Sequence, residues 1–128
     1  MNAQRQPART TPADAAPVVL ACTLSPGAAD YALGAPRDCR FFDGHFPDCP
    51  VLPGVAQLRW AIELSAALTG DRAVAGLERI KFMRAITPSD RVQLALRLGD
   101  DSRVVAFRYH DGDIGFSSGR LLLEPHRD

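Results

Sequence analysis

A histidine and a helix start lie nine residues apart, at His45 and Gly54, and together they suit chemistry on a carbonyl compound. His45 follows Gly44 and is surrounded by phenylalanines, and an imidazole held there can act as a general base near neutral pH. Pro53-Gly54 opens a helix whose first N–H groups have no intrahelical partners. A carbonyl that docks at the Gly54 amide would gain hydrogen bonds and a favourable dipole as it becomes enolate-like. The two features predict proton abstraction next to a thioester carbonyl.

The loop that carries the histidine is predicted to be stiff. Residues 41–53 contain Gly44, Pro47, Pro50 and Pro53, and this density of proline excludes a regular helix or a central strand. Proline fixes φ and lowers the entropy lost when a loop becomes ordered. We therefore expect a preorganised segment that leads directly into the helix.

The clearest helix is predicted over residues 54–68, which contain good helix formers and no internal proline, with Gly70 as the stop signal. The helix is apolar nearly all round, and such a helix is normally buried. Arg59 and Glu63 are its charged exceptions, and their i, i+4 spacing predicts an ion pair.

The rest of the chain predicts strands, in an order typical of an α+β fold with one helix against an antiparallel sheet. Alternating apolar residues and Gly- or Asp-containing turns define the later strands, and a DG hairpin is expected at Asp111-Gly112. The segment Pro26–Asp38 is predicted to be mostly loop. The predicted strands cover residues 18–24, 73–86, 91–98, 103–110 and 114–123.

Length and composition bound the function. The 128 residues predict a single domain over residues 17–128 after a disordered tail at 1–16. Fifteen basic residues balance fifteen acidic ones, which argues against nucleic-acid binding through phosphate neutralisation. No apolar run could span a membrane or serve as a secretory signal, so we expect a cytoplasmic protein. Three scattered cysteines predict neither a disulfide framework nor a zinc site, and no cofactor is expected.

The stretch FFDGHFPDCPVLPGV, residues 41–55, resembles the 3-hydroxyacyl-carrier-protein dehydratases of type II fatty-acid synthesis. Ile80–Arg84 and Pro88-Ser89-Asp90 are similar to a second stretch of that family, so the resemblance covers roughly residues 37–98. The continuation to Trp60 looks especially like the small dehydratases of aryl-polyene and related polyketide-like clusters. The resemblance implies a hotdog fold, in which the sheet wraps around the helix.

The resemblance also implies the parts of a site. It gives His45 as the base, Gly54 N–H as the carbonyl donor, and an acyl tunnel at the interface of a homodimer or a hotdog heterodimer. The expected substrate contacts are Phe46, Pro53, Gly54, Val55 and Arg59. An acyl carrier protein or coenzyme A would be the thioester handle.

At one position the sequence departs from this pattern. Fourteen residues after His45, where the resemblance implies a carboxylic acid, the chain has Arg59. A guanidinium does not give up a proton at neutral pH. Glu63, one helical turn on, is a candidate replacement acid, and Asp43, Asp48 or a bound water are alternatives.

Three functions therefore stay open. The first is a lyase that removes water from a 3-hydroxyacyl thioester. The second is a hotdog subunit that binds acyl thioesters without dehydrating them, which Arg59 favours. The third is an acyl thioesterase on the same fold, which would need a carboxylate or a histidine to activate water.

Overall fold

A computed structural model describes residues 17–34, 51–70, 72–87 and 90–125 of the chain. The apolar alternation of the sequence becomes strands, and the segment rich in Ala and Leu becomes helix, as their propensities favour. The elements in chain order are β1 (Val18–Ser25), β2 (Ala28–Gly34), α2 (Gly54–Leu64), α3 (Ala66–Thr69), β3 (Val74–Phe82), β4 (Val92–Leu98), β5 (Val104–Asp111) and β6 (Ile114–Leu123).

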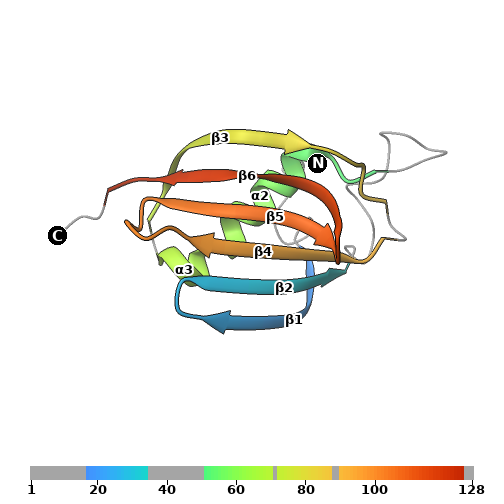
Figure 1. Cartoon of the computed structure of the whole chain (residues 1–128), viewed down its shortest axis with the longest axis horizontal. Helices are drawn as coiled ribbons and strands as arrows, with labels where there is room; N and C mark the ends of the chain where they lie inside the picture. The colour runs from blue at the N-terminus through green and yellow to red at the C-terminus, as the bar shows by residue number, and fades with distance from the viewer. Residues whose placement is uncertain (1–16, 35–50, 71, 88–89, 126–128) are drawn as a thin grey trace, which may run out of the picture.

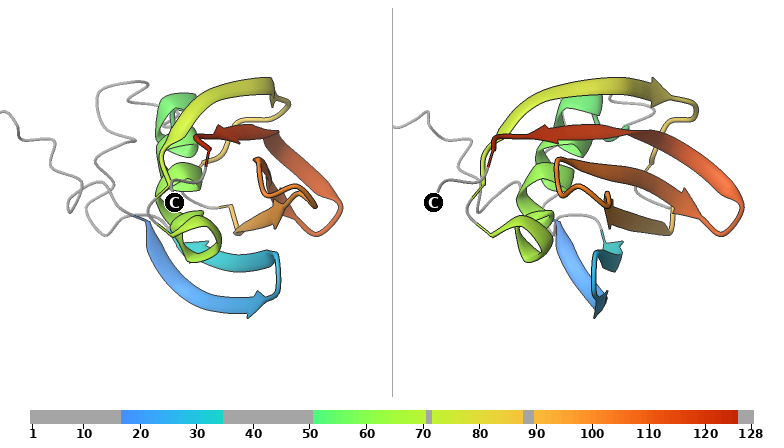
Figure 2. Two further views of the ribbon diagram at one scale, coloured as in Figure 1. Left: turned by 90° about the vertical axis from the view of Figure 1, so that its left-hand side faces the viewer. Right: turned by 60° about the vertical axis from the view of Figure 1, so that its left-hand side comes forward.

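The six strands form one antiparallel sheet in the order β1-β2-β4-β5-β6-β3 (Figure 1). Strand β3 follows the helices in sequence, yet it pairs with the last strand, β6, at the edge of the sheet. The sheet curves around α2, as the two further views show (Figure 2). One curved antiparallel sheet around a central helix is a hotdog fold, so the predicted fold class is confirmed.

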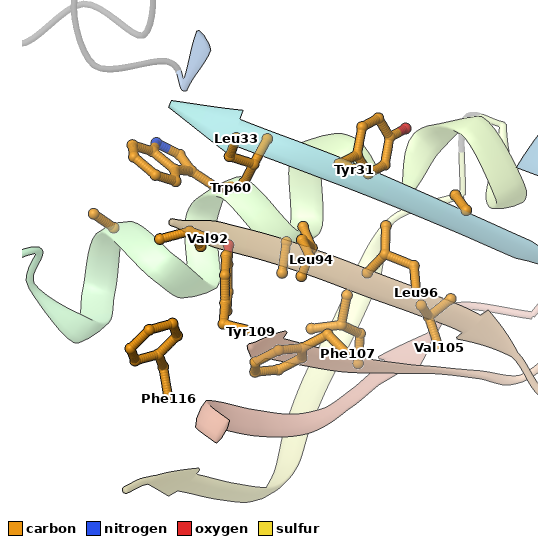
Figure 3. Close-up of a cluster of buried hydrophobic side chains, with 14 of the residues drawn as sticks. Tyr31, Leu33, Trp60, Val92, Leu94, Leu96, Val105, Phe107, Tyr109 and Phe116 are labelled. Atoms are coloured by element: carbon orange, nitrogen blue, oxygen red, sulfur yellow. The ribbon is translucent and has the colours of Figure 1, made fainter. Parts of the chain in front are cut away.

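The core lies between α2 and the concave face of the sheet (Figure 3). On β4, Val92, Leu94 and Leu96 are buried, while Gln93 and Arg97 are exposed, as the alternation of the sequence predicted. The largest buried side chains include two from each of β4, β5 and β6, so a single apolar layer holds helix and sheet together. They include Tyr109, Phe116, Ile86, Leu94, Leu96, Leu121 and Val105.

The prediction that Pro26–Asp38 is mostly loop was wrong over Ala28–Gly34, which form strand β2. Strand β2 pairs with β1 on one side and with β4 on the other. Its residues Ala29, Tyr31 and Leu33 alternate into the core. Glycine and alanine contribute little to strand propensity, so the pairing on both sides outweighs a weak local preference.

The helical segment differs from its prediction in two ways. It ends at Leu64, and a separate short helix, Ala66–Thr69, follows Ser65. It is also not buried all round, because Val55 is 74% exposed and Arg59 and Glu63 are exposed as well. Only one side of the helix has a sheet to cover it, so an apolar residue on the other side stays in contact with solvent.

The later strands confirm their predictions to within a residue or two, except that β3 ends at Phe82 rather than Ile86. The DG hairpin is also confirmed, because β5 ends at Asp111 and β6 begins at Ile114. Gly112 has φ 57°, a left-handed conformation that glycine adopts without steric cost.

Gly119 makes room for the core on the inner face of β6. A Cβ there would collide with Ile80 Cδ1 and would lie 2.7 Å from Phe107 Cε2. We therefore expect Gly119→Ala to lower the free energy of unfolding by about 1–3 kcal/mol, the usual cost of overpacking a core. Urea unfolding followed by circular dichroism measures this, with Gly76→Ala as the control. At Gly76 the nearest atom, Leu122 Cδ1, lies 3.5 Å away. Equal stability of the Gly119 variant and the native chain would contradict the assignment.

Candidate active site

The amino terminus of α2 has no side-chain cap among the described residues. Pro53 precedes the helix with extended backbone, φ −62° and ψ 150°, and no side chain caps the first turn. Ala56 and Gln57 both donate their N–H to Pro53 O, at 3.1 and 3.2 Å. Neither Gly54 nor Val55 donates its N–H to another described residue. Among the described residues, these two amides of the helix end have no hydrogen-bond acceptor.

The ring of Phe82, at the end of β3, lies directly against Gly54. A Cβ added at Gly54 would lie 2.7 Å from Phe82 Cζ, so any side chain there would require the Phe82 ring to move. Phe82 is 53% exposed, and its neighbour Met83 is 54% exposed. An apolar surface therefore borders the helix amides, and it suits an acyl chain better than a polar substrate.

The exposed face of α2 carries Val55, Arg59 and Glu63. Arg59 Nε donates to Glu63 Oε2 at 3.3 Å, so the predicted ion pair is confirmed. Both side chains are close to half exposed, at 45% and 41%. Exposed i, i+4 pairs contribute only about 0.3–0.5 kcal/mol, so stability alone does not explain why these charges lie here.

A buried polar network behind the first turn was missed by sequence reasoning. Gln57 is 3% exposed, its Nε2 donates to Leu52 O at 3.1 Å, and its Oε1 accepts from Ser117 Oγ at 2.6 Å. Its own carbonyl accepts a hydrogen bond from the Tyr109 hydroxyl at 2.6 Å. A glutamine in a helix is an ordinary helix former, so only the contacts with β5 and β6 reveal this role.

Two tyrosines of the sheet hold α2 at its two ends. Tyr109 donates to Gln57 O near the start, and Tyr31 donates to Leu64 O at 3.1 Å at the end. Burial raises the pKa of Tyr109 above its ordinary value, with a smaller contribution from Glu63, and burial also raises the pKa of Tyr31. Both hydroxyls thus stay protonated as donors at neutral pH, and they fix the helix relative to the sheet.

The structure places part of the predicted site. Pro53, Gly54 and Val55 come together at the helix start, and Arg59 and Glu63 lie along the same helix. His45 and Phe46 lie outside the described residues, as do Asp43 and Asp48. The tail at 1–16 lies outside them too. The roles of all these residues stay predictions.

Two further findings on the described residues concern metal sites and membrane-spanning helices. No group of three or more His, Cys, Asp or Glu side chains there could hold a metal ion. None of the described helices has the length and apolar character to cross a membrane.

The fold defines a class of protein, the hotdog proteins. The sequence model of the ApeI-like family, described as ApeI dehydratase, matches residues 22–120. This match covers most of the 128 residues. The chain belongs to the ApeI-like dehydratase family, and the resemblance seen in the motif is confirmed.

Known relatives agree with this assignment. The chain is 34% identical over 95 residues to the 3-hydroxyacyl-[acyl-carrier-protein] dehydratase FabZ of Streptococcus agalactiae serotype V, covering 65% of this chain and 67% of the relative. It is 40% identical over 60 residues to FabZ of Streptococcus suis, covering 41% of this chain but only 43% of that relative. The solved dehydratase heterocomplex ApeI:P of Xenorhabdus doucetiae has a chain of TM-score 0.76 and 26% identity, with 85% of this chain and 98% of that chain covered.

Proposed function

We propose that this protein removes water from 3-hydroxyacyl thioesters to give trans-2-enoyl thioesters in fatty-acid or polyketide-like biosynthesis. The family assignment supports this reaction, and the observation that carries it here is the helix start at Gly54, whose amide has no acceptor among the described residues. In the proposed reaction the substrate carbonyl accepts a hydrogen bond from the Gly54 N–H, and the imidazole of His45 takes the α-proton. The electron pair of the broken C–H bond forms the new double bond, and the β-hydroxyl leaves with a proton as water.

The proposed pocket is completed by a second hotdog subunit. Strand β3 is at the edge of the sheet, and its Leu77 is 42% exposed. Val55, Phe82 and Met83 are each more than half exposed, and a group of this kind favours an interface. A homodimer would cover this surface with its own copy. A heterodimer is supported by the ApeI:P relative, which is a heterocomplex.

The acid is proposed to come from the exposed face of α2. Glu63 is the carboxylate on this face, and it accepts a hydrogen bond from Arg59. In a homodimer Glu63 is the proposed acid. In a heterodimer a carboxylate of the other subunit takes that role, and this chain contributes the base and the Gly54 donor.

The substrate handle and the location complete the proposal. An acyl carrier protein is the proposed carrier, because the FabZ relatives are named for acyl-carrier-protein substrates. Lys81, Arg84 and Arg91 are exposed and could meet an acidic carrier. Cytoplasmic location stays a prediction.

An assay with a 3-hydroxyacyl carrier protein tests the function. The purified protein is incubated with the substrate, and the enoyl product and free thiol are both followed by mass spectrometry. We expect enoyl product without free thiol, and the reverse reaction from the enoyl thioester. Free thiol alone would indicate a thioesterase and would overturn the proposal. Binding without either product would overturn the homodimer with Glu63 as its acid.

A further inference from the structure

The buried glutamine of α2 has no role in the proposed reaction, yet both the nitrogen and the oxygen of its side-chain amide form hydrogen bonds. We propose that Gln57 is a positioning residue that holds the Gly54 amide in place for the substrate carbonyl. The inference rests on the proposed function, because it concerns how the carbonyl donor of that reaction is fixed. Gln57 touches neither substrate nor reacting atoms in this proposal, and it acts through Leu52 and the first turn of the helix.

The first step concerns Leu52, two residues before Gly54. Its carbonyl accepts a hydrogen bond from Gln57 Nε2 at 3.1 Å, and its N–H donates to Ile86 O at 2.8 Å. Leu52 is only 4% exposed. Both of its backbone groups are thus held, and Pro53 has a restricted φ immediately afterwards. The backbone from Leu52 to Gly54 therefore has little conformational freedom while Gln57 keeps its hydrogen bond to Leu52.

The second step concerns the other end of the amide. Gln57 Oε1 accepts from Ser117 Oγ at 2.6 Å, and Ser117 is fully buried on β6. Ser117 is paired with Phe82 in the sheet, and the ring of Phe82 lies against Gly54. The same glutamine is therefore connected to the segment before Gly54 and to the strand pair behind it.

The orientation of the amide is determined by its partners. A carbonyl can only accept, so the NH₂ group of Gln57 must face Leu52 O. The oxygen then faces Ser117, whose hydroxyl can donate. A flipped amide would bring two acceptors together at Leu52. The Gln57 amide therefore has one favourable orientation, and a residue that positions a backbone segment needs such a fixed orientation.

The consequence for the reaction is geometric. An oxyanion donor must lie within about 2.7–3.1 Å of the developing oxyanion to stabilise it. A displacement of about 1 Å in a supporting element can lower the rate about 10²-fold. Loss of the Leu52 contact would let the Gly54 amide move, and it would affect the transition state more than substrate binding.

The experiment uses the full-length protein with Gln57→Leu, which keeps most of the side-chain volume, and Gln57→Glu. For Gln57→Leu we expect kcat to fall at least about tenfold while KM changes less than about threefold, the pattern for an interaction realised in the transition state. Gln93→Leu is the matched control, because Gln93 is exposed on the outer face of β4, and we expect less than about twofold change.

Gln57→Glu gives a readout that loss of stability alone would not give. A protonated carboxyl can donate to Leu52 O and accept from Ser117, as the amide does, whereas a carboxylate can only accept. We expect the ratio of its kcat to that of the native protein to rise toward one as the pH falls. A ratio that is the same at all pH values, or an unchanged kcat in Gln57→Leu, would overturn the proposal.

Two further measurements test the positioning role of Gln57 independently of the kcat of Gln57→Leu. Hydrogen exchange of the Leu52 amide, which donates to Ile86 O at 2.8 Å, should be faster in Gln57→Leu than in Gln93→Leu when followed by NMR, and equal rates would contradict the proposal. This measurement needs no substrate, so it still applies if the native protein shows no dehydration and the proposed function fails. If Gln57→Leu does not fold, Ser117→Ala replaces it, with an expected fall in kcat of about threefold or more, and native kcat there would count against the proposal.

Discussion

The variant His45→Ala is expected to lose enoyl formation by about 10²–10⁴-fold, the contribution of a positioned general base. The reason is that no other group of the predicted loop combines a basic nitrogen with apolar surroundings beside the helix start. Turnover of a 3-hydroxyacyl carrier protein measures the loss, at substrate concentrations high enough to separate kcat from KM. Because the Gly54 donor remains in this variant, we expect KM to change much less than kcat.

The matched control for this variant is His110→Ala. His110 lies at the end of β5, and its Nδ1 is 3.2 Å from Gly112 O, so it is part of a hairpin rather than of the helix start. We expect its kcat to stay within about twofold of the native value. Native activity in His45→Ala would remove the base from the mechanism, and equal losses in both variants would indicate an effect on folding alone.

The helix and five of the six strands could be predicted because their local signals agree with their surroundings. On β4 the alternation Val92, Leu94 and Leu96 matches a buried face, and on β6 the run up to Leu123 has both ends as predicted. Proline and glycine marked the segment that leads into Gly54. In these places propensity, periodicity and burial all favour the same structure.

Strand β2 could not be predicted because its pairing partners include a strand that is remote in sequence. Its partner β4 lies more than fifty residues on, in the register Tyr31 to Leu94. The small residues of Ala28–Gly34 have little strand propensity of their own. The bonds to β1 and β4 determine the strand, and such contacts are not visible in a local pattern.

Sequence reasoning predicted only those residues of the candidate site that the family motif supplied. The motif gave Gly54, and the structure shows that the ring of Phe82 lies against it. The motif did not give Gln57, whose role depends on Leu52 and Ser117. The apolar composition of the helix also led to the expectation of burial all round, although the exposed Val55 shows that one chain covers only part of it.

The residues on the exposed face of α2 indicate that the general acid limits the rate of the proposed reaction. A carboxylate oxygen that accepts a hydrogen bond from a guanidinium is engaged with that partner rather than with a substrate. Glu63 is in this situation with Arg59, at 3.3 Å. It also lies one helical turn, about 5.4 Å, beyond the position where the resemblance implies an acid. If the protein acts as the proposed homodimer, we therefore expect the native chain to dehydrate its substrate slowly.

Arg59→Glu is accordingly expected to raise kcat of the homodimer about tenfold or more. The substitution introduces a carboxyl group at the position implied by the motif, and it also frees Glu63 from its ion pair. Two carboxyl groups one turn apart repel each other when both are ionised, so one of them retains a proton more readily. A proton donor is then present where the β-hydroxyl leaves, and a well-placed acid contributes about 10²–10⁴-fold.

Arg59→Gln is the control, because it removes the guanidinium and the ion pair without adding an acid. If the missing acid limits the native rate, Arg59→Glu will exceed both the native protein and Arg59→Gln. If freeing Glu63 is sufficient, both variants will be faster than the native protein, and Glu63→Gln in the Arg59→Gln background will abolish the gain. A lower kcat in Arg59→Glu than in the native protein would contradict both mechanisms. It would instead assign Arg59 itself to the reaction, as a cation that stabilises the departing hydroxide.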